Sequence, residues 1–390
     1  MTIILFDDHL RSQFLPLAFT RPLAELRLGI LTLKEKWQHI SKYQVFYKTQ
    51  KYLSEKYPEQ LTEENLYVNA RYLASKELLE SIKNLNDNEV LKHDEIVLAY
   101  RLKKNQSLDL SKLKEVQADI KLEFVKSVTD LFSKNHKAIE NDFTLLTEGR
   151  TSQPIPETVT CFNRGQIFIE EGATLYNGTL NANDGPIYIG KDAEVMENSA
   201  IRGPFALCEH STVKMGSKIY TGTTIGPHSK VGGEVSNSMI LGYSNKGHDG
   251  FLGNSVIGEW CNLGADTNIS NLKNNYANVK LWDYDTSRFK DTGLQFCGLI
   301  MGDHSKCSIN MMFNTGTIVG VSANIFGSGF PRNFVPSFSW GGSQGVITYK
   351  LNKVFEVAEL VMKRRGLTLT VDDQAILENV FEMTSTYRRD

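Results

Sequence analysis

Residues 189–231 read IGKDAEVMENSAIRGPFALCEHSTVKMGSKIYTGTTIGPHSKV, and aliphatic side chains recur in this stretch at strict intervals of six. The repeating aliphatic residues are Ile189, Val195, Ile201, Leu207, Val213, Ile219, Ile225 and Val231. Four positions after each of the first seven stands a small residue, except at Phe205. This is the hexapeptide pattern of a parallel β-helix, in which each six-residue face turns one aliphatic side chain inward. Because such coils stack at roughly the 4.8 Å spacing of β-strands, we predict a continuous solenoid.

The same frame returns later in the chain. The later inward positions are Ile257, Leu263, Ile269, Met301, Cys307, Phe313, Val319 and Ile325. Two segments interrupt it: a glycine-flanked insertion around residues 245–250, and residues 270–296, which read as a loop expelled from one corner. Expelled loops of solenoids are frequent binding sites. We therefore predict a parallel β-helix over residues 156–345 and helices over residues 346–390 that cap its open end.

The part of the chain before residue 156 has a different pattern. Strand-like runs alternate with helical stretches over residues 1–110, which predicts an α/β domain with a largely parallel sheet. Residues 111–148 lack Gly and Pro and carry apolar residues at helical spacing. We read residues 111–155 as linker helices that end at the boundary segment EGRTSQPIPE.

Composition excludes several classes of protein. The chain has 43 basic and 45 acidic residues, so no basic field is available to attract nucleic acid. Its five cysteines are odd in number and widely spaced, which argues against a disulfide framework and against a cysteine zinc site. The segment MTIILFDDHLRSQ is too short in apolar residues for a signal peptide or a membrane span. We expect a cytoplasmic protein with no membrane partner.

Two stretches resemble a known family. The block NKGHDGFLGNSVIGEWCNLGADTNISN (245–271) resembles the acetyltransferase domain of the bifunctional GlmU-like enzymes, and PLAFTRPLAELRLGILTLKEKW (16–37) is similar to their nucleotidyltransferase pattern. The resemblance implies a left-handed β-helix, a homotrimer, and acetyltransferase sites shared between neighbouring subunits. It also implies acetyl transfer from acetyl-CoA to glucosamine 1-phosphate. Uridylyl transfer from UTP would then give UDP-N-acetylglucosamine.

The same resemblance assigns roles to individual residues. His248 falls on the catalytic base of the family and Glu234 on a carboxylate that orients it. Asn262 and Asn271 fall on substrate-binding asparagines, and Ala265 on a backbone position that lines the CoA groove. Four residues depart from the family pattern. Phe251 stands where the family has a Tyr, Ser236 where it has a substrate-binding lysine, and Asp266 where it has a Gly. Tyr220 stands near the position where the family has a phosphate-binding arginine. These departures leave the identity of the acceptor sugar open.

The chemistry of acetyl transfer supports the choice of residue types. An ammonium group is not a nucleophile, so a base that works near neutral pH is needed, and imidazole with its ordinary pKa of about 6.5 suits this task. His248 is such a base within a glycine-flanked segment. Lys246, with Lys273 or Lys280 in the expelled loop, is a candidate to bind the sugar phosphate.

Nucleotidyl transfer needs a glycine-rich loop for the triphosphate, a basic group and a carboxylate for Mg²⁺. The segment FDDHLRSQF stands where that loop belongs, and it contains no glycine. Asp7 and Asp8 are the candidate Mg²⁺ ligands. Arg11, Arg21 and Lys36 are the candidate ligands of the nucleotide and sugar phosphates. The missing glycines leave it open whether this domain catalyses.

Other functions also fit parts of the sequence. Hexapeptide solenoids include zinc enzymes, and His210 and His228 lie eighteen residues apart, one full coil. Zinc needs at least three protein ligands, and no third histidine has usable spacing, so these two predict a surface ladder instead. A non-catalytic trimeric scaffold with a degenerate N-terminal domain, or a nucleotidyltransferase acting alone, stays open as an alternative.

Overall fold

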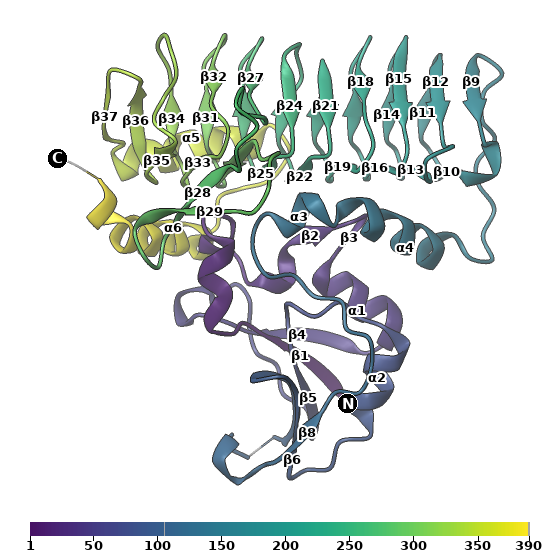
Figure 1. Ribbon diagram of the computed structural model, residues 1–390, viewed down its shortest axis with the longest axis vertical. Helices are drawn as coiled ribbons and strands as arrows, with labels where there is room; N and C mark the ends of the chain where they lie inside the picture. Colours follow the sequence, from purple (N-terminus) through teal and green to yellow (C-terminus); the bar gives the residue numbers. More distant parts are fainter. Residues whose placement is uncertain (105, 389–390) are drawn as a thin grey trace.

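The two predicted parts of the chain are present and lie one against the other (Figure 1). The computed structural model describes residues 1–104 and 106–388. A long β-helix runs across the top of the view, and the N-terminal domain lies below its middle. No helix in these two ranges is long and apolar enough to cross a membrane.

The β-helix has three faces made of short parallel strands. The first face holds β10 (Ile167–Ile169), β13 (Ile187–Ile189), β16 (Phe205–Leu207), β19 (Thr223–Ile225), β22 (Met239–Gly242), β25 (Val256–Glu259), β30 (Leu299–Met301), β33 (Thr317–Val319) and β35 (Phe334–Val335). The second holds β11 (Thr174–Leu175), β14 (Glu194–Val195), β17 (Thr212–Val213), β20 (Lys230–Val231), β23 (Asn245–Lys246), β26 (Asn262–Leu263), β31 (Lys306–Cys307), β34 (Asn324–Ile325) and β36 (Ser339–Gly342), with β37 (Gly345–Thr348) antiparallel at its end. The third holds β9 (Val159–Phe162), β12 (Gly178–Asn181), β15 (Ser199–Arg202), β18 (Lys218–Ile219), β21 (Glu234–Ser236) and β24 (Phe251–Gly253), continued by β27 (Asn268–Ile269) and β32 (Met312–Phe313). The predicted left-handed β-helix is confirmed.

The inward frame does not lapse where the sequence pattern seemed to break. Val235, Ile240, Lys246 and Leu252 are at most 2 % exposed and carry the coils through this region without an insertion. The irregularity lies in the spacing, because four positions separate Val231 from Val235, and five separate Val235 from Ile240 and Leu252 from Ile257, instead of six. The predicted insertion around residues 245–250 is therefore wrong. Three shortened steps shifted the frame, and a lysine at an inward position concealed it.

The N-terminal domain is built on a mixed sheet. Its strand order is β4 (Gln44–Lys48), β1 (Thr2–Phe6), β5 (Glu64–Asn69), β7 (Ile96–Lys103), β6 (Glu89–His93) and β8 (Lys114–Gln117), with helices α1 (Leu33–Ser41) and α2 (Lys76–Lys83) packed against it. Strand β1 is parallel to β4 and β5, whereas β7 is antiparallel to both its neighbours. The α/β class and the largely parallel sheet are confirmed, because β6 and β8 also pair in parallel and β7 is the one strand of this sheet that runs against the others.

The prediction of helices from residue 111 onward is wrong for the first part of that segment. Residues 114–117 form β8, which pairs with β6 in the N-terminal sheet. Helices begin only with α3 (Asp130–Ser133) and α4 (Asn135–Thr147). Ile139 and Phe143 of α4 pack on the ladder Phe168, Tyr188 and Ala206 of the first β-helix face. The helix is thus a packed layer between the two parts rather than a free linker.

The C-terminal helices do not cap the solenoid as predicted. Helices α5 (Leu351–Lys363) and α6 (Val371–Met383) lie along its side, where Val354, Met362 and Val380 join the core shared with the N-terminal domain (Figure 1). They lie there because α5 is amphipathic and its apolar stripe needs a long face to cover. The hairpin β28 (Lys280–Asp283) and β29 (Arg288–Asp291), formed by the expelled loop, lies on the same side.

A capping box begins α1, the helix that carries Lys36 toward the domain junction. The Thr32 hydroxyl accepts the Glu35 N–H at 3.1 Å, and the Glu35 carboxylate accepts the Thr32 N–H at 2.7 Å. We expect Thr32→Ala to lower the free energy of unfolding by about 1 kcal/mol in urea denaturation. Ser81→Ala, inside α2, is the control and should cause no loss, because Ala is the better helix former. Equal losses in both variants would contradict the capping role.

Candidate functional site

The candidate catalytic histidine stands at a corner of the β-helix. Residues 247–250 (GHDG) turn the chain from β23 to β24, and His248 lies two positions after an inward residue. Met215 and Ala265 occupy the same position in other coils, so His248 belongs to a row of outward corner side chains. Its side chain is exposed, and the imidazole has no hydrogen-bond partner among the residues that the structure describes. Both ring nitrogens are therefore open to a ligand.

The shortened corner between Val231 and Val235 lies against this turn, and the residues it places there are Gly232 and Gly233. A Cβ on Gly233, whose φ is +74°, would come within 2.8 Å of the Asp249 Cα, and one on Gly232 within 2.8 Å of the Gly247 carbonyl oxygen. Backbone therefore packs on backbone here, and no side chain covers the His248 turn from this direction.

Lys246 lies inside the β-helix rather than at its surface. It pairs with Val231 in the column of inward residues and is 2 % exposed. Its ammonium donates hydrogen bonds to the carbonyl oxygens of Gly232 and His248, each at 2.9 Å. Burial lowers the pKa of Lys246 to about 8, although the carboxylates of Asp249 and Asp266 act in the opposite direction. The predicted contact of Lys246 with a sugar phosphate does not fit this inward placement.

The other predicted acetyltransferase residues lie on coils adjacent to the His248 turn. The N–H of Glu234 donates to the Gly250 carbonyl at 3.2 Å, which places Glu234 beside the end of that turn. No hydrogen bond joins the Glu234 carboxylate to His248 within the described ranges. Ala265 takes the equivalent corner position one coil later, and the Asp266 N–H donates to the Asp249 carbonyl at 3.1 Å.

The asparagines form two short ladders. Asn262 accepts a hydrogen bond at 3.0 Å from the side chain of Asn245, which precedes Lys246 in β23. Asn271 donates to the side chain of Asn254 at 2.8 Å. Asn262 is exposed, so its amide can also meet a ligand. Asn245 and Asn254, to which the sequence analysis gave no role, are the hydrogen-bond partners of the two predicted asparagines.

The candidate metal ligands of the N-terminal domain are engaged with the protein. Asp7 accepts hydrogen bonds from the Leu23 N–H and the Thr49 hydroxyl and pairs with Arg11 at 3.2 Å. Burial raises the pKa of Asp7. Burial alone would raise the pKa of Asp8 too, but hydrogen bonds from Arg71 and Asn69 outweigh it and lower that pKa.

Mg²⁺ does not fit these two carboxylates as they stand. Both oxygens of each accept hydrogen bonds from protein groups. Over residues 1–104 and 106–388, no group of three or more His, Cys, Asp or Glu side chains has the geometry to hold a metal ion. The two aspartates instead hold the loops at the carboxyl edge of the sheet.

The candidate phosphate ligands lie in buried contacts of the domain junction. Arg21 is ion-paired with Asp303, from the loop after β30, and with Glu259 of β25 at 2.8 Å. Burial alone would lower the pKa of Arg21, but these two carboxylates raise it well above its ordinary value. Lys36 is paired with Asp142 of α4, and burial lowers the pKa of Lys36. The structure therefore places both cations against β-helix and α4 carboxylates, not toward an open nucleotide site.

Arg11 has protein partners as well. Its guanidinium donates to the Ala18 carbonyl and to the Tyr52 hydroxyl, in addition to its pair with Asp7. Close by, Ser12 and Gln13 bond to Asp285 in the turn of the β28–β29 hairpin, each at 2.8 Å. The segment that replaces the glycine-rich loop is thus held against the expelled hairpin of the β-helix.

The predicted histidine ladder is confirmed. The rings of His210 and His228 stack with centroids 4.8 Å apart, and the stack continues through Tyr243, Trp260 and His304. All five residues have a left-handed backbone at the corner of their coil. Burial lowers the pKa of His228, and neighbouring His210 lowers it further. The row is a stacking element of the fold rather than a set of zinc ligands.

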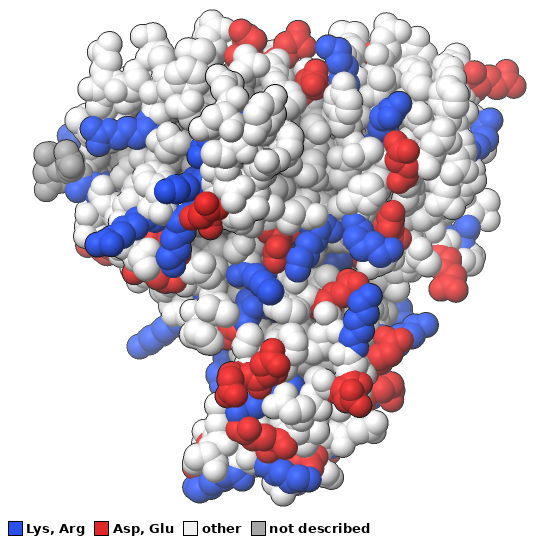
Figure 2. All heavy atoms as spheres, in the orientation of Figure 1, with Lys and Arg blue, Asp and Glu red and all other residues white. Residues whose placement is uncertain are grey.

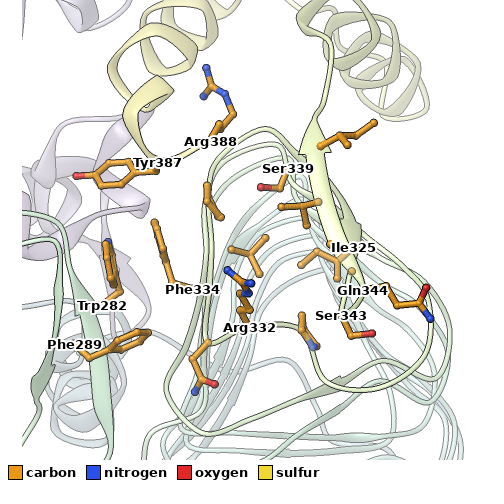
Figure 3. A pocket seen from close by; sticks show the side chains of 18 of the residues that line it. Trp282, Phe289, Ile325, Arg332, Phe334, Ser339, Ser343, Gln344, Tyr387 and Arg388 are labelled. Atoms are coloured by element: carbon orange, nitrogen blue, oxygen red, sulfur yellow. The ribbon is translucent and has the colours of Figure 1, made fainter. Parts of the chain in front are cut away.

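A large cavity lies at the C-terminal end of the solenoid, and His248 is not among the residues that line it. It has a volume of about 1050 Å³, and Figure 3 shows Trp282, Phe289 and Phe334 on one side, with Arg332 between Phe334 and Ile325. Lys273 and Lys280 of the expelled segment also line it. Figure 2 shows basic and acidic side chains interspersed over both parts on the face drawn, in keeping with the near balance of charge.

Known proteins share parts of this architecture. Residues 3–151 match the family described as sugar nucleotidyl transferase. The chain is 32 % identical over 144 residues to a bifunctional sugar-1-phosphate nucleotidylyltransferase/acetyltransferase from Sulfurisphaera tokodaii, a match that covers 36 % of this chain and 35 % of the relative. It is 33 % identical over 118 residues to a bifunctional protein GlmU from Methanocaldococcus jannaschii, covering 30 % of this chain and 26 % of the relative.

The predicted resemblance to the GlmU-like family is confirmed. The two matches span 35 % and 26 % of the length of these relatives. Among solved structures, the polySia-specific acetyltransferase NeuO matches 49 % of this chain and 81 % of its own, with 13 % identity and a TM-score of 0.21.

Proposed function

We propose that this GlmU-like chain transfers the acetyl group of acetyl-CoA to the amine of an amino-sugar 1-phosphate, with glucosamine 1-phosphate as the first acceptor to test. The observation that carries the proposal is the exposed His248 imidazole, without an internal partner, on a turn that hydrogen bonds fix to both neighbouring coils. The relative from Sulfurisphaera tokodaii, whose name includes acetyltransferase, supports the same activity.

The residues divide the chemistry between them. His248 accepts a proton from the attacking amine as its nitrogen bonds to the acetyl carbon, and the thiolate of CoA leaves and receives a proton. Glu234 lies beside the end of the turn, and it would orient the imidazole if its carboxylate turned to accept the ring N–H when substrate binds. Asn262 and Asn271 bind the sugar, and the corner at Ala265 lines the path of CoA. A homotrimer would place these residues at a boundary between subunits.

The test is release of free CoA thiol from acetyl-CoA with glucosamine 1-phosphate, with parallel reactions that contain other hexosamine 1-phosphates or no acceptor. Thiol release that depends on an acceptor supports the proposal and names the sugar. Acetyl-CoA binding without thiol release for any acceptor would assign the site to another acyl acceptor. If acetyl-CoA does not bind, the acetyltransferase proposal fails, and the scaffold alternative takes its place.

The second candidate function is nucleotidyl transfer from UTP to a sugar 1-phosphate, giving a product of the UDP-N-acetylglucosamine type. The match of residues 3–151 to sugar nucleotidyl transferases favours it. The engaged carboxylates and the buried pairs of Arg21 and Lys36 argue against it. Pyrophosphate release from UTP with Mg²⁺ and N-acetylglucosamine 1-phosphate tests it. Acetyl transfer without pyrophosphate release would make this domain a non-catalytic partner of the β-helix.

A further inference from the structure

The inward columns of the β-helix contain one charged side chain next to the candidate active site. In the second face, the residues before Lys246 in its column are Leu175, Val195, Val213 and Val231, and those after it are Leu263, Cys307 and Ile325. All seven of these neighbours are buried members of one apolar cluster. Lys246 therefore introduces an ammonium where an aliphatic side chain is the rule.

The ammonium is not needed for packing, but it makes two specific contacts. Burying a charge is unfavourable unless hydrogen bonds compensate, and an apolar residue of similar volume is often the more stable choice. Here Nζ donates at 2.9 Å to the carbonyl of His248 itself and at 2.9 Å to that of Gly232 in the shortened corner. The two bonds tie the His248 turn to the coil beneath it.

The other hydrogen bonds of the turn within the described ranges do not involve the carbonyl of His248. The Gly232 N–H donates to the Lys246 carbonyl at 2.7 Å, and the Asp249 carbonyl accepts from Asp266 on the other side. The glycines on both sides of His248 and in the preceding corner allow many backbone conformations. Among the described residues, Lys246 is the one whose side chain donates a hydrogen bond to the carbonyl of His248.

We propose that Lys246 is a positioning residue for His248: from inside the β-helix, its ammonium fixes the carbonyl of His248 and so the direction in which the imidazole leaves the corner. This proposal rests on the proposed acetyltransferase function for its catalytic consequence. The hydrogen bond from Lys246 to the His248 carbonyl and its effect on the turn do not depend on that function.

The experiment compares Lys246→Met with Lys306→Met in the full chain. Methionine matches the length of lysine and suits the apolar column, and Lys246→Leu is the second variant should methionine pack poorly. Lys306 is the matched control, because its ammonium also donates to the backbone carbonyl of a histidine two positions away, that of His304, at 2.9 Å. That contact lies at a different corner of the β-helix.

We expect Lys246→Met to keep or raise the thermal midpoint, while kcat for acetyl transfer falls about 10- to 100-fold and KM for acetyl-CoA stays within about twofold. Lys306→Met should leave kcat unchanged. A role in stability alone would lower the midpoint and leave kcat of the folded fraction intact, and that result, or an unchanged kcat, would overturn the proposal.

Hydrogen–deuterium exchange separates this proposal from the proposed function. In Lys246→Met, the peptide spanning residues 244–251 should exchange at least about tenfold faster than in the wild type, and the same peptide in Lys306→Met should not change. If the variants show these exchange differences but the wild-type protein turns over no acetyl-CoA, the proposed acetyltransferase function fails, while the role of Lys246 in fixing the turn stands. Unchanged exchange in Lys246→Met and Lys246→Leu would overturn the tie whatever the activity.

Discussion

His248→Ala should lower the rate of acetyl transfer by about 10²- to 10⁴-fold while the protein stays folded, since that is the usual contribution of a positioned general base. The exposed imidazole makes no hydrogen bond within the described parts of the chain, so its removal breaks no internal contact. Thiol release under saturating acetyl-CoA and acceptor measures the effect on kcat. Acetyl-CoA binding should persist, because the base acts on the amine and not on CoA.

His210→Ala provides the matched control. His210 is also an exposed histidine at a coil corner, but it stacks on His228 in the ladder at a different corner of the solenoid. We expect its rate of acetyl transfer to equal that of the wild type. If His248→Ala retains the full rate, or if both variants lose the same fraction of it, His248 is not the base, and another group must accept the proton.

The β-helix could be predicted because its pattern is local. An inward aliphatic residue every six positions reports the fold coil by coil, so errors arose only where one coil departs from the rule. The step from Val231 to Val235 is two residues short, two later steps (235–240 and 252–257) are one residue short, and at Lys246 the inward residue is charged. These departures fall in the coils around His248. A search for inward positions that allowed corners of four or five residues would have found the continuous frame.

The N-terminal site was predicted less well because its partners are distant in sequence. Arg21 and Asp303 lie 282 positions apart, and Lys36 and Asp142 lie 106 apart. A basic residue that neutralises a buried carboxylate and one that binds a phosphate look alike in sequence, since both offer the same donors. The alternation pattern likewise could not tell β8 from a helix, because β8 is only four residues long.

Asp303 connects the two parts of the molecule more directly than any other residue discussed above. One carboxylate oxygen accepts hydrogen bonds from the Thr20 hydroxyl at 2.6 Å and from Arg21, and the other accepts the Glu259 N–H at 2.8 Å. Asp303 is 3 % exposed and Arg21 is 5 % exposed. The junction therefore depends on a carboxylate shielded from water that compensates a buried guanidinium.

We expect Asp303→Ala to lower the free energy of unfolding by about 3–5 kcal/mol, because it leaves Arg21 buried with only half of its compensating charge and leaves the Glu259 N–H without its acceptor. Urea denaturation measures the loss. Glu356→Ala, which removes the exposed pair of Glu356 with Lys353, is the control and should leave the midpoint unchanged within error. If Asp303→Ala is as stable as the control, the Asp303 carboxylate does not stabilise the junction, and the pair of Arg21 with Glu259 suffices to compensate the buried guanidinium.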